Sequence, residues 1–137
     1  MTDAELVAKK LARVESALVE LRTFATAEEI ARDLKTERFV EHTLQIAIQA
    51  AIDAASHVVS DERLGEPEAN RDLFLLLARH GWIPGEIAER LARMAGFRNV
   101  LVHGYEQVDL AIVRDVFENR LGDFEEYVAA IRARLRG

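Results

Sequence analysis

Apolar side chains recur every three or four positions along much of the chain, which is the period of an amphipathic helix rather than of a strand. One stripe near the N-terminus predicts a first helix of about five turns; its members are Val7, Leu11, Val14, Leu18 and Leu21. A second stripe predicts a last long helix that begins after a capping residue, Asp109; its members are Val113, Phe117, Leu121, Phe124, Val128, Ile131 and Leu135.

Capping residues and stop signals divide the sequence between these two helices. Thr26 and Glu29 have the spacing of a capping box and predict a short second helix that ends near Asp33. Thr36 can cap a third helix, which runs to about Asp61 and stops at a stretch that contains glycine and proline.

A fourth helix is predicted over Ala69–Arg79 and ends at His80 and Gly81, and Pro84 then opens a fifth helix in its first turn. No alternating strand pattern competes with these elements. The sequence therefore predicts a single all-α domain over residues 1–137, an up-and-down bundle of about five or six helices.

Cysteine usage and the N-terminal sequence bear on the compartment. The chain of 137 residues has no cysteine, so disulfides and thiolate metal sites are excluded and a reducing compartment is favoured. It has neither a basic start with an apolar run nor an apolar stretch near the roughly 18 residues of a membrane span. We expect a cytoplasmic protein that is neither exported nor inserted in a membrane.

The net charge of -6 argues against a general DNA-coating protein, because backbone binding depends on many Lys and Arg contacts to phosphates. Any nucleic-acid site must therefore be local. Of the 18 basic residues 15 are arginine, which suits forked recognition of phosphate, although a GC-rich genome would give the same bias.

The pattern R-x4-H-x-Y places Arg98, His103 and Tyr105 within eight residues of the fifth helix. Arg98 falls on the apolar stripe that includes Leu91 and Met94, so we expect it either to have a fixed anionic partner or to face a cleft where a phosphate takes that place. If the helix continues to Tyr105, this residue lies nearly two turns after Arg98 and shares its side. The structural alternatives are an ion pair for Arg98, a helix-end histidine and a packed tyrosine.

Asn99 and His103 are four residues apart and lie side by side on the adjacent stripe of the same helix. Arg98 is about 140° from His103 around the helix axis, so a long side chain or a bend near Gly104 must bring the two groups together. The motif thus predicts two neighbouring functional faces.

A polar stripe on the third helix is the second irregularity; its members are His42, Gln45, Gln49, Asp53, Ser56 or His57, and Ser60. A stripe with one formal charge indicates either a semi-buried groove or subunit contact, or a thinly charged surface. Asp53 is the candidate to pair with Arg98 or to orient His103.

Metal and cofactor motifs are absent from the sequence. The four histidines show no HExxH or paired-ligand spacing on one helix, so no metal site is predicted. There is also no glycine-rich phosphate loop, no GxSxG elbow and no nucleotidyltransferase Gly-Ser with a downstream Asp-x-Asp. The sequence therefore predicts no cofactor.

Two separated segments, residues 44–57 and 91–105, together resemble the HepT family of the HEPN superfamily of small helical ribonucleases. The most specific part is Gly96, Phe97, Arg98 and Asn99 leading to His103 and Tyr105, and the similarity in helix order covers about residues 5 to 135. The resemblance implies a metal-independent RNase toxin in which Arg98 and His103 are the catalytic pair and Asn99 assists. It also implies an antitoxin of the MntA type, a minimal nucleotidyltransferase that transfers AMP onto Tyr105.

One chain supplies one motif histidine, whereas metal-free RNA cleavage works best with one group that accepts a proton and another that donates one. A symmetric homodimer that juxtaposes two copies of Arg98 and His103 would supply both, and HEPN proteins resemble this arrangement. Two other interpretations remain: a non-catalytic helical subunit that binds a nucleotide or substrate for a separate nucleotidyltransferase, and a purely structural interaction bundle.

Overall fold

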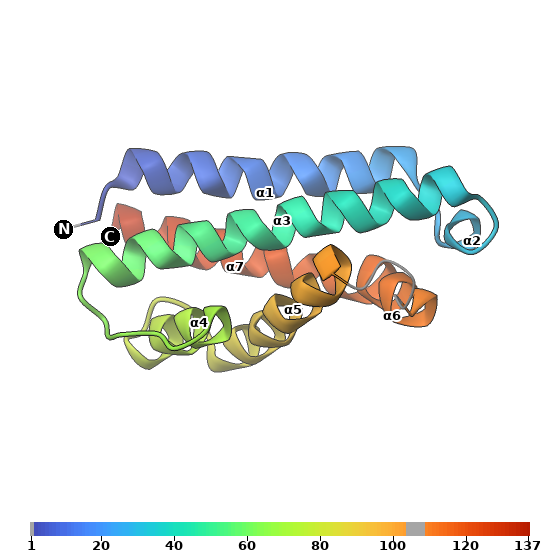
Figure 1. Ribbon diagram of the computed structural model, residues 1–137. Helices are drawn as coiled ribbons and strands as arrows, with labels where there is room; N and C mark the ends of the chain where they lie inside the picture. The colour runs from blue at the N-terminus through green and yellow to red at the C-terminus, as the bar shows by residue number, and fades with distance from the viewer. Residues whose placement is uncertain (1, 104–108) are drawn as a thin grey trace.

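Four long helices form the body of the protein, and Figure 1 shows successive long helices running in opposite directions. The computed structural model describes residues 2–103 and 109–137, and side chains except those of residues 102 and 103. The long helices are α1 (Ala4–Phe24), α3 (Leu34–Asp61), α5 (Gly85–His103) and α7 (Leu121–Arg136). The prediction of an all-α up-and-down bundle is therefore confirmed.

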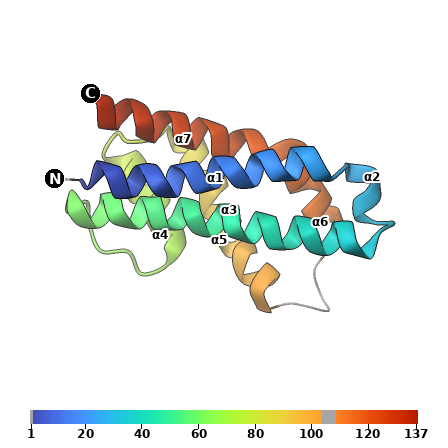
Figure 2. The same cartoon turned by 90° about the horizontal axis from the view of Figure 1, so that it is seen from above.

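Three short helices connect the long ones: α2 (Ala27–Ile30), α4 (Asn70–Arg79) and α6 (Leu110–Asp115). The start of α1 and the end of α7 lie at the same end of the bundle, and α2 and α6 lie at the other (Figure 1). Seen from above, α5 crosses obliquely under α3, and its C-terminal turns emerge beyond the side of α3 (Figure 2). The crossing brings the end of α5 to the edge of the bundle.

The central helix is α3, which packs against α1, α4 and α5. Its buried faces are rich in alanine, and these small side chains let neighbouring helices approach from several sides; the buried alanines are Ala47, Ala50, Ala51, Ala54 and Ala55. Larger side chains from the surrounding helices fill the remaining space, and Phe74, Phe124 and Tyr127 are the bulkiest that are fully buried. The predicted stripes of α1 and α7 all face this core or its margin.

Two stop signals act as predicted. Gly81 follows α4 with a φ of 77°, a left-handed conformation that glycine adopts without steric cost. Gly65 follows α3 with a φ of 144°, and a Cβ at this position would lie 2.8 Å from Cδ2 of Leu76. Glycine is therefore required after α3 both for its backbone conformation and for the close approach of α4.

The capping prediction for α3 is wrong by one turn. Asp33 is the N-cap, and its side chain accepts a hydrogen bond from the main-chain N of Lys35. Thr36 lies inside the helix and donates a 2.8 Å hydrogen bond from Oγ1 to Oδ2 of Asp33. Asp33 is the better acceptor because its ionised carboxylate can receive both bonds at once, and the preceding short helix ends earlier, at Ile30.

The last predicted helix has the expected extent but an interruption within it. Asp109 caps it as predicted, since its Oδ1 accepts a 2.8 Å hydrogen bond from the main-chain N of Ala111. Residues Val116–Arg120 then form a π-helical turn between α6 and α7. The wider turn holds one extra residue, so α6 and α7 bend away from a common axis, as Figure 1 shows.

In the described parts of the chain, no helix is long and apolar enough to cross a membrane.

Candidate active site

Arg98 lies five residues before the end of α5, whose C-terminal turns emerge from under α3 (Figure 2). The preceding turns of α5 bury Ile87, Leu91 and Ala95, and Arg98 continues this face as a half-buried side chain. Its Nε is buried and has no hydrogen-bond partner in the part of the chain that the structure describes. A buried guanidinium nitrogen without an acceptor costs free energy, so a ligand oxygen that accepts a hydrogen bond from it would be stabilised there.

The polar contact that the structure gives Arg98 comes from its own motif. Nη1 of Arg98 donates to Oδ1 of Asn99 at 3.5 Å, the upper limit of hydrogen-bond length. Asn99 is exposed. Among residues 2–101 and 109–137 no carboxylate pairs with Arg98, so the structural ion pair is not found there.

The other two residues of the motif stay predictions. His103 is the last residue of α5, and its side chain lies outside the described residues. Tyr105 lies outside them entirely. Of the motif residues, the structure brings together Arg98 and Asn99.

The predicted pairing of Asp53 with Arg98 is wrong. Oδ2 of Asp53 lies 3.5 Å from Nζ of Lys10 on α1, and Oδ1 accepts a 2.8 Å hydrogen bond from Nε2 of Gln49. Asp53 thus faces α1, whereas Arg98 lies on α5, on another side of α3. The second option, that Asp53 orients His103, stays a prediction.

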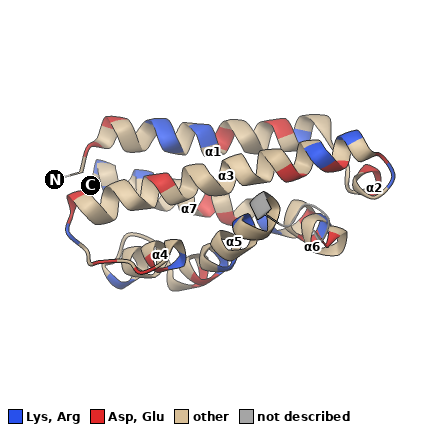
Figure 3. Ribbon diagram, in the orientation of Figure 1, with Lys and Arg blue, Asp and Glu red and all other residues tan. Residues whose placement is uncertain are grey.

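The polar stripe of α3 lines a groove between α1 and α3. Gln45, Gln49 and Asp53 are half-buried there, opposite Lys10 and Arg13 of α1. The surface of the middle of α3 is almost free of charged residues, in contrast to the mixed charges along α1 (Figure 3). The semi-buried groove therefore holds for the middle of the predicted stripe, whereas His42, Ser56 and Ser60 are exposed.

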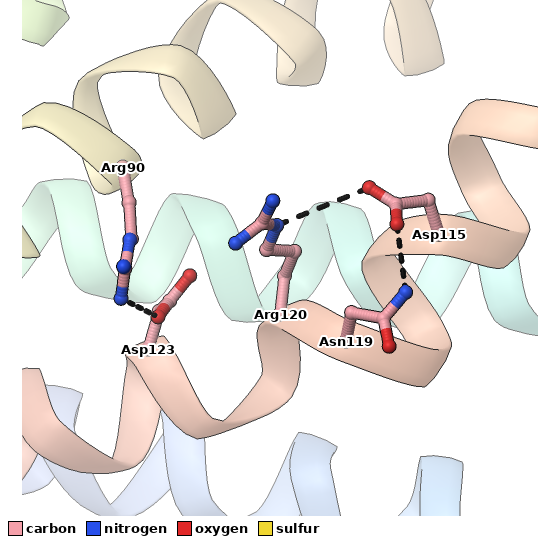
Figure 4. Close-up of polar contacts among 5 residues, drawn as sticks. All are labelled: Arg90, Asp115, Asn119, Arg120 and Asp123. Carbon is pink, nitrogen blue, oxygen red and sulfur yellow. Dashed lines mark hydrogen bonds and ion pairs between the residues drawn. The ribbon is translucent and has the colours of Figure 1, made fainter.

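A cavity of about 230 Å³ lies beside the motif, between α5 and the segment formed by α6 and the π-helical turn. Arg90 and Arg93 of α5 and Arg120 of the turn contribute its cationic wall. Figure 4 shows Arg90 pointing from α5 to Asp123 of α7, at 3.2 Å, and Arg120 pointing from the turn toward α5. Sequence reasoning missed this cluster.

No pattern in the sequence connects Arg120 with Arg90 and Arg93, which are separated from it by the end of one helix and the start of the next. The π-helical turn sets where Arg120 points, and a π-turn has no sequence signature of the kind that caps and stops have. The pair Arg90 and Arg93, three apart on one helix, was the signal that could have been followed.

The fold and the R-x4-H motif together define a helical-bundle ribonuclease. A model of the family described as ribonuclease HepT-like matches residues 14–131. The chain belongs to the HepT-like ribonuclease family, which confirms the resemblance inferred from the sequence.

Two relatives carry nuclease names. The mRNA nuclease HepT of Shewanella oneidensis is 30% identical over 130 residues, which cover 94% of this chain and 98% of the relative. The tRNA nuclease HepT of Aphanizomenon flos-aquae is 33% identical over 95 residues, or 69% of this chain and 65% of the relative. The first alignment spans nearly the whole of both chains.

Among solved structures, a tri-AMPylated Shewanella oneidensis HEPN toxin in complex with an MNT antitoxin superposes with a TM-score of 0.87. The identity is 30%, and the match covers 97% of this chain and 99% of that one. The two proteins therefore share the whole bundle.

Proposed function

We propose that this protein is a metal-independent endoribonuclease, active in the cytoplasm as the toxin of a toxin-antitoxin pair and built as one domain over residues 1–137. The observation that carries the proposal is the state of Arg98, which is half-buried near the C-terminal end of α5 and whose Nε has no partner among the described residues. Among the described side chains no carboxylate has to release this guanidinium before it can bind an RNA phosphate. The nuclease names of the relatives support the same activity.

Arg98 has the role of holding the scissile phosphate and stabilising the negative charge that develops on it. Asn99, whose Oδ1 contacts Nη1 of Arg98, holds that guanidinium in place and presents its amide NH₂ to the RNA. His103 moves the protons. As the 2'-oxygen bonds to phosphorus it loses its proton to one imidazole, and the departing 5'-oxygen receives a proton as its bond to phosphorus breaks.

These two proton transfers need a base and an acid, and each chain offers one motif histidine. A homodimer that faces two copies of the R-x4-H segment supplies one His103 for each task. It also concentrates two Arg98 side chains in a protein whose net charge is -6, which makes the shared cleft locally attractive to RNA.

The regulatory partner in this proposal is a nucleotidyltransferase antitoxin of the MntA type, which transfers AMP to the hydroxyl of Tyr105. The Shewanella toxin was crystallised in an AMPylated form with its MNT antitoxin, which supports this assignment. Phosphates added two residues after His103 would place negative charge and bulk where the RNA phosphate has to bind, and so block cleavage.

The test is metal-free cleavage of RNA by the purified protein with EDTA present. Removing a proton-transfer group costs about 10²–10⁴ in rate, so we expect a loss of that size for His103→Ala. Removing a charge-stabilising donor costs about 10²–10³, which is the loss expected for Arg98→Gln. Matched controls are His42→Ala and Arg79→Gln, both exposed side chains on other helices.

Wild-type protein that leaves RNA intact, or a His103→Ala variant that cuts at the wild-type rate, would overturn the ribonuclease assignment. Circular dichroism and sedimentation of each variant show whether folding and dimerisation are kept. A variant that is folded and dimeric but inactive supports the proposed role. Wild-type protein that sediments as a monomer under the assay conditions and still cuts RNA at the full rate would overturn the two-chain site.

A further inference from the structure

The cavity between α5 and the π-helical turn combines three guanidinium groups with an apolar wall. Arg90, Arg93 and Arg120 contribute the cations. The apolar side chains are Met94, Phe97, Ile112 and Val116. Ile112 is 48% exposed, so part of its side chain is open to a ligand in this concave surface.

The charged side chains in and around the cavity carry a net positive charge, which favours an anionic ligand. Arg90 is paired with Asp123 at 3.2 Å, and Arg120 lies 3.9 Å from Asp115, at the limit of an ion pair. Oδ1 of Asp115 also accepts a 2.8 Å hydrogen bond from Asn119, a neutral donor (Figure 4), so two carboxylates stand against three guanidinium groups. Arg93 is exposed and makes no ion pair with any described side chain.

The size of the cavity selects among anionic ligands. Its volume of about 230 Å³ is below the range of roughly 300–1,000 Å³ typical of pockets that bury drug-sized molecules. It can therefore enclose one planar ring system, with any charged group left at the rim. A partly buried phenyl ring, Phe97, together with arginines is the combination with which proteins bind single-stranded nucleic acid by stacking and charge.

The cavity adjoins the motif arginine. Met94 lines it and is four residues before Arg98 on α5, so the two side chains are neighbours about 6 Å apart along the helix. Stacked nucleotides advance roughly 3.4 Å each along a strand. An RNA strand with a phosphate at Arg98 therefore reaches the cavity within one or two nucleotides.

We propose that this cavity is a nucleotide subsite, in which a base flanking the cleaved bond lies against Phe97 and Ile112 while its phosphate binds Arg93 and Arg120. The inference rests on the ribonuclease function proposed above and extends it to a second contact with the substrate. The π-helical turn has a definite task in this site, since it carries Arg120 and directs it toward α5 (Figure 4).

The test measures binding rather than cleavage, so that it stands apart from the test of the ribonuclease. A fluorescent single-stranded RNA is titrated with protein that carries His103→Ala, alone and with either Arg93→Gln or Ile112→Ala. Arg79→Gln is the matched control for Arg93, and Val19→Ala, at an exposed aliphatic residue on α1, is the control for Ile112.

Arg93→Gln is expected to weaken binding about 3- to 10-fold and to reduce the slope of log K against log salt by about 0.7, the value for one phosphate contact on a single strand. Ile112→Ala is expected to weaken binding about 3- to 10-fold with an unchanged salt slope, because stacking and apolar contact carry no counterion release. The two control variants keep the reference affinity.

An abasic scan locates the base. A ribose without a base is moved one position at a time along the RNA, and one position is expected to weaken binding to the reference protein. In the Ile112→Ala variant that penalty shrinks, since the base and the side chain are two partners of one contact. A penalty that stays the same size in this variant overturns the subsite.

Three further outcomes also overturn the proposal. The first is RNA affinity and salt slope unchanged in both variants. The second is loss of free AMP binding in the Arg93→Gln variant with RNA binding intact, which would make the cavity a site for a free nucleotide. The third is a change of oligomeric state in sedimentation, which would make it a contact between copies of the chain.

The two proposals fail separately. Wild-type protein that binds RNA in the predicted way but does not cut it keeps the subsite as a binding site and removes the ribonuclease. Wild-type protein that cuts RNA while Arg93→Gln and Ile112→Ala bind as the reference keeps the ribonuclease and removes the subsite.

Discussion

The hydroxyl of Tyr127 on α7 donates a 2.8 Å hydrogen bond to the main-chain oxygen of Ala51 on α3, inside the core. The ring of Tyr127 is fully buried and lies edge-on against Phe74, with 5.6 Å between the ring centroids. The chain has two tyrosines, and burial raises the pKa of this one far above its usual value. Tyr127 is therefore a structural residue whose oxygen no transferase can reach in the folded protein.

The burial of Tyr127 predicts where AMP attaches. With two tyrosines in the chain and one enclosed in the core, tyrosine modification of the folded protein has to fall on Tyr105. We expect Tyr105→Phe to abolish AMP addition by the cognate transferase with ATP, and Tyr127→Phe to leave it intact. Intact-protein and peptide mass spectrometry check both variants, and AMP on Tyr127 or on the Tyr105→Phe variant would contradict the assignment.

The same hydrogen bond predicts a modest change in stability. In Tyr127→Phe the oxygen of Ala51 loses one partner but keeps its helical bond, so the free energy of unfolding should fall by about 1 kcal/mol. Urea unfolding followed by circular dichroism measures this difference. A loss above roughly 3 kcal/mol would mean that the ring repacks as well, since that exceeds a single hydrogen bond.

The helices were predictable because their periodicity, caps and stop residues act locally. Asp109 and Gly81 have the expected roles for that reason. The cap of α3 was misplaced because Asp33 and Thr36 both offer an acceptor one turn apart, and their mutual hydrogen bond decides the outcome. Propensity alone does not rank two such neighbours.

The site was predictable only where its residues are close in sequence. Arg98 and Asn99 meet as helical neighbours, and the semi-buried state of Arg98 follows from its place on the apolar stripe. The partner of Asp53 was misjudged because the central helix α3 has neighbours on several sides, and the side that Asp53 faces depends on the packing of α1. Tertiary contacts of this kind leave no local pattern.

The ion pair between Arg90 and Asp123 connects α5 to α7 with unequal burial: the side chain of Asp123 is 8% exposed and that of Arg90 is 40% exposed. Oδ2 of Asp123 is buried and has no partner among the described residues, so Arg90 is the main compensation for this carboxylate there. We expect Arg90→Gln to lower the free energy of unfolding by about 2 kcal/mol, less than for a fully buried pair because water reaches the arginine.

A double variant separates the interaction energy of Arg90 and Asp123 from the effects of the two single substitutions. Asp123→Asn removes the buried charge and leaves Arg90 hydrated, so its cost should be smaller, about 1 kcal/mol. In Arg90→Gln with Asp123→Asn the combined loss should be less than the sum of the single losses, as measured by urea unfolding in a double-mutant cycle. Strict additivity would show that the two side chains do not interact in solution.

Glu41 on α3 predicts a stability difference that depends on pH. Its side chain is 11% exposed, its Oε1 is buried without a partner, and burial raises the pKa of its carboxyl above 4.5. Nearby Glu37 raises the pKa further, and Arg38, whose Nη1 lies 3.5 Å from Oε2, opposes the shift. The protonated form therefore suits the folded state better than the ionised form.

A raised pKa gives a contribution to stability that is complete below the unfolded-state pKa and is lost as the pH rises through the folded-state pKa. Above the unfolded-state pKa, Glu41 thus costs the folded protein free energy that a side chain without a charge would not cost. Glu41→Gln should raise the urea midpoint at pH 7, and the gain should shrink toward zero as the pH falls below 4.5, where Glu41 is neutral in both states.

Glu15 provides the control of opposite sign. A hydrogen bond from Arg132 lowers the pKa of its carboxyl, so its contribution is present above the unfolded-state pKa and is lost as the pH falls through the folded-state pKa. Glu15→Gln should therefore lower the urea midpoint at pH 7, by less at lower pH. If Glu41→Gln also lowers the midpoint at pH 7, the ion pair with Arg38 outweighs the cost of burial, and the predicted sign for Glu41 is wrong.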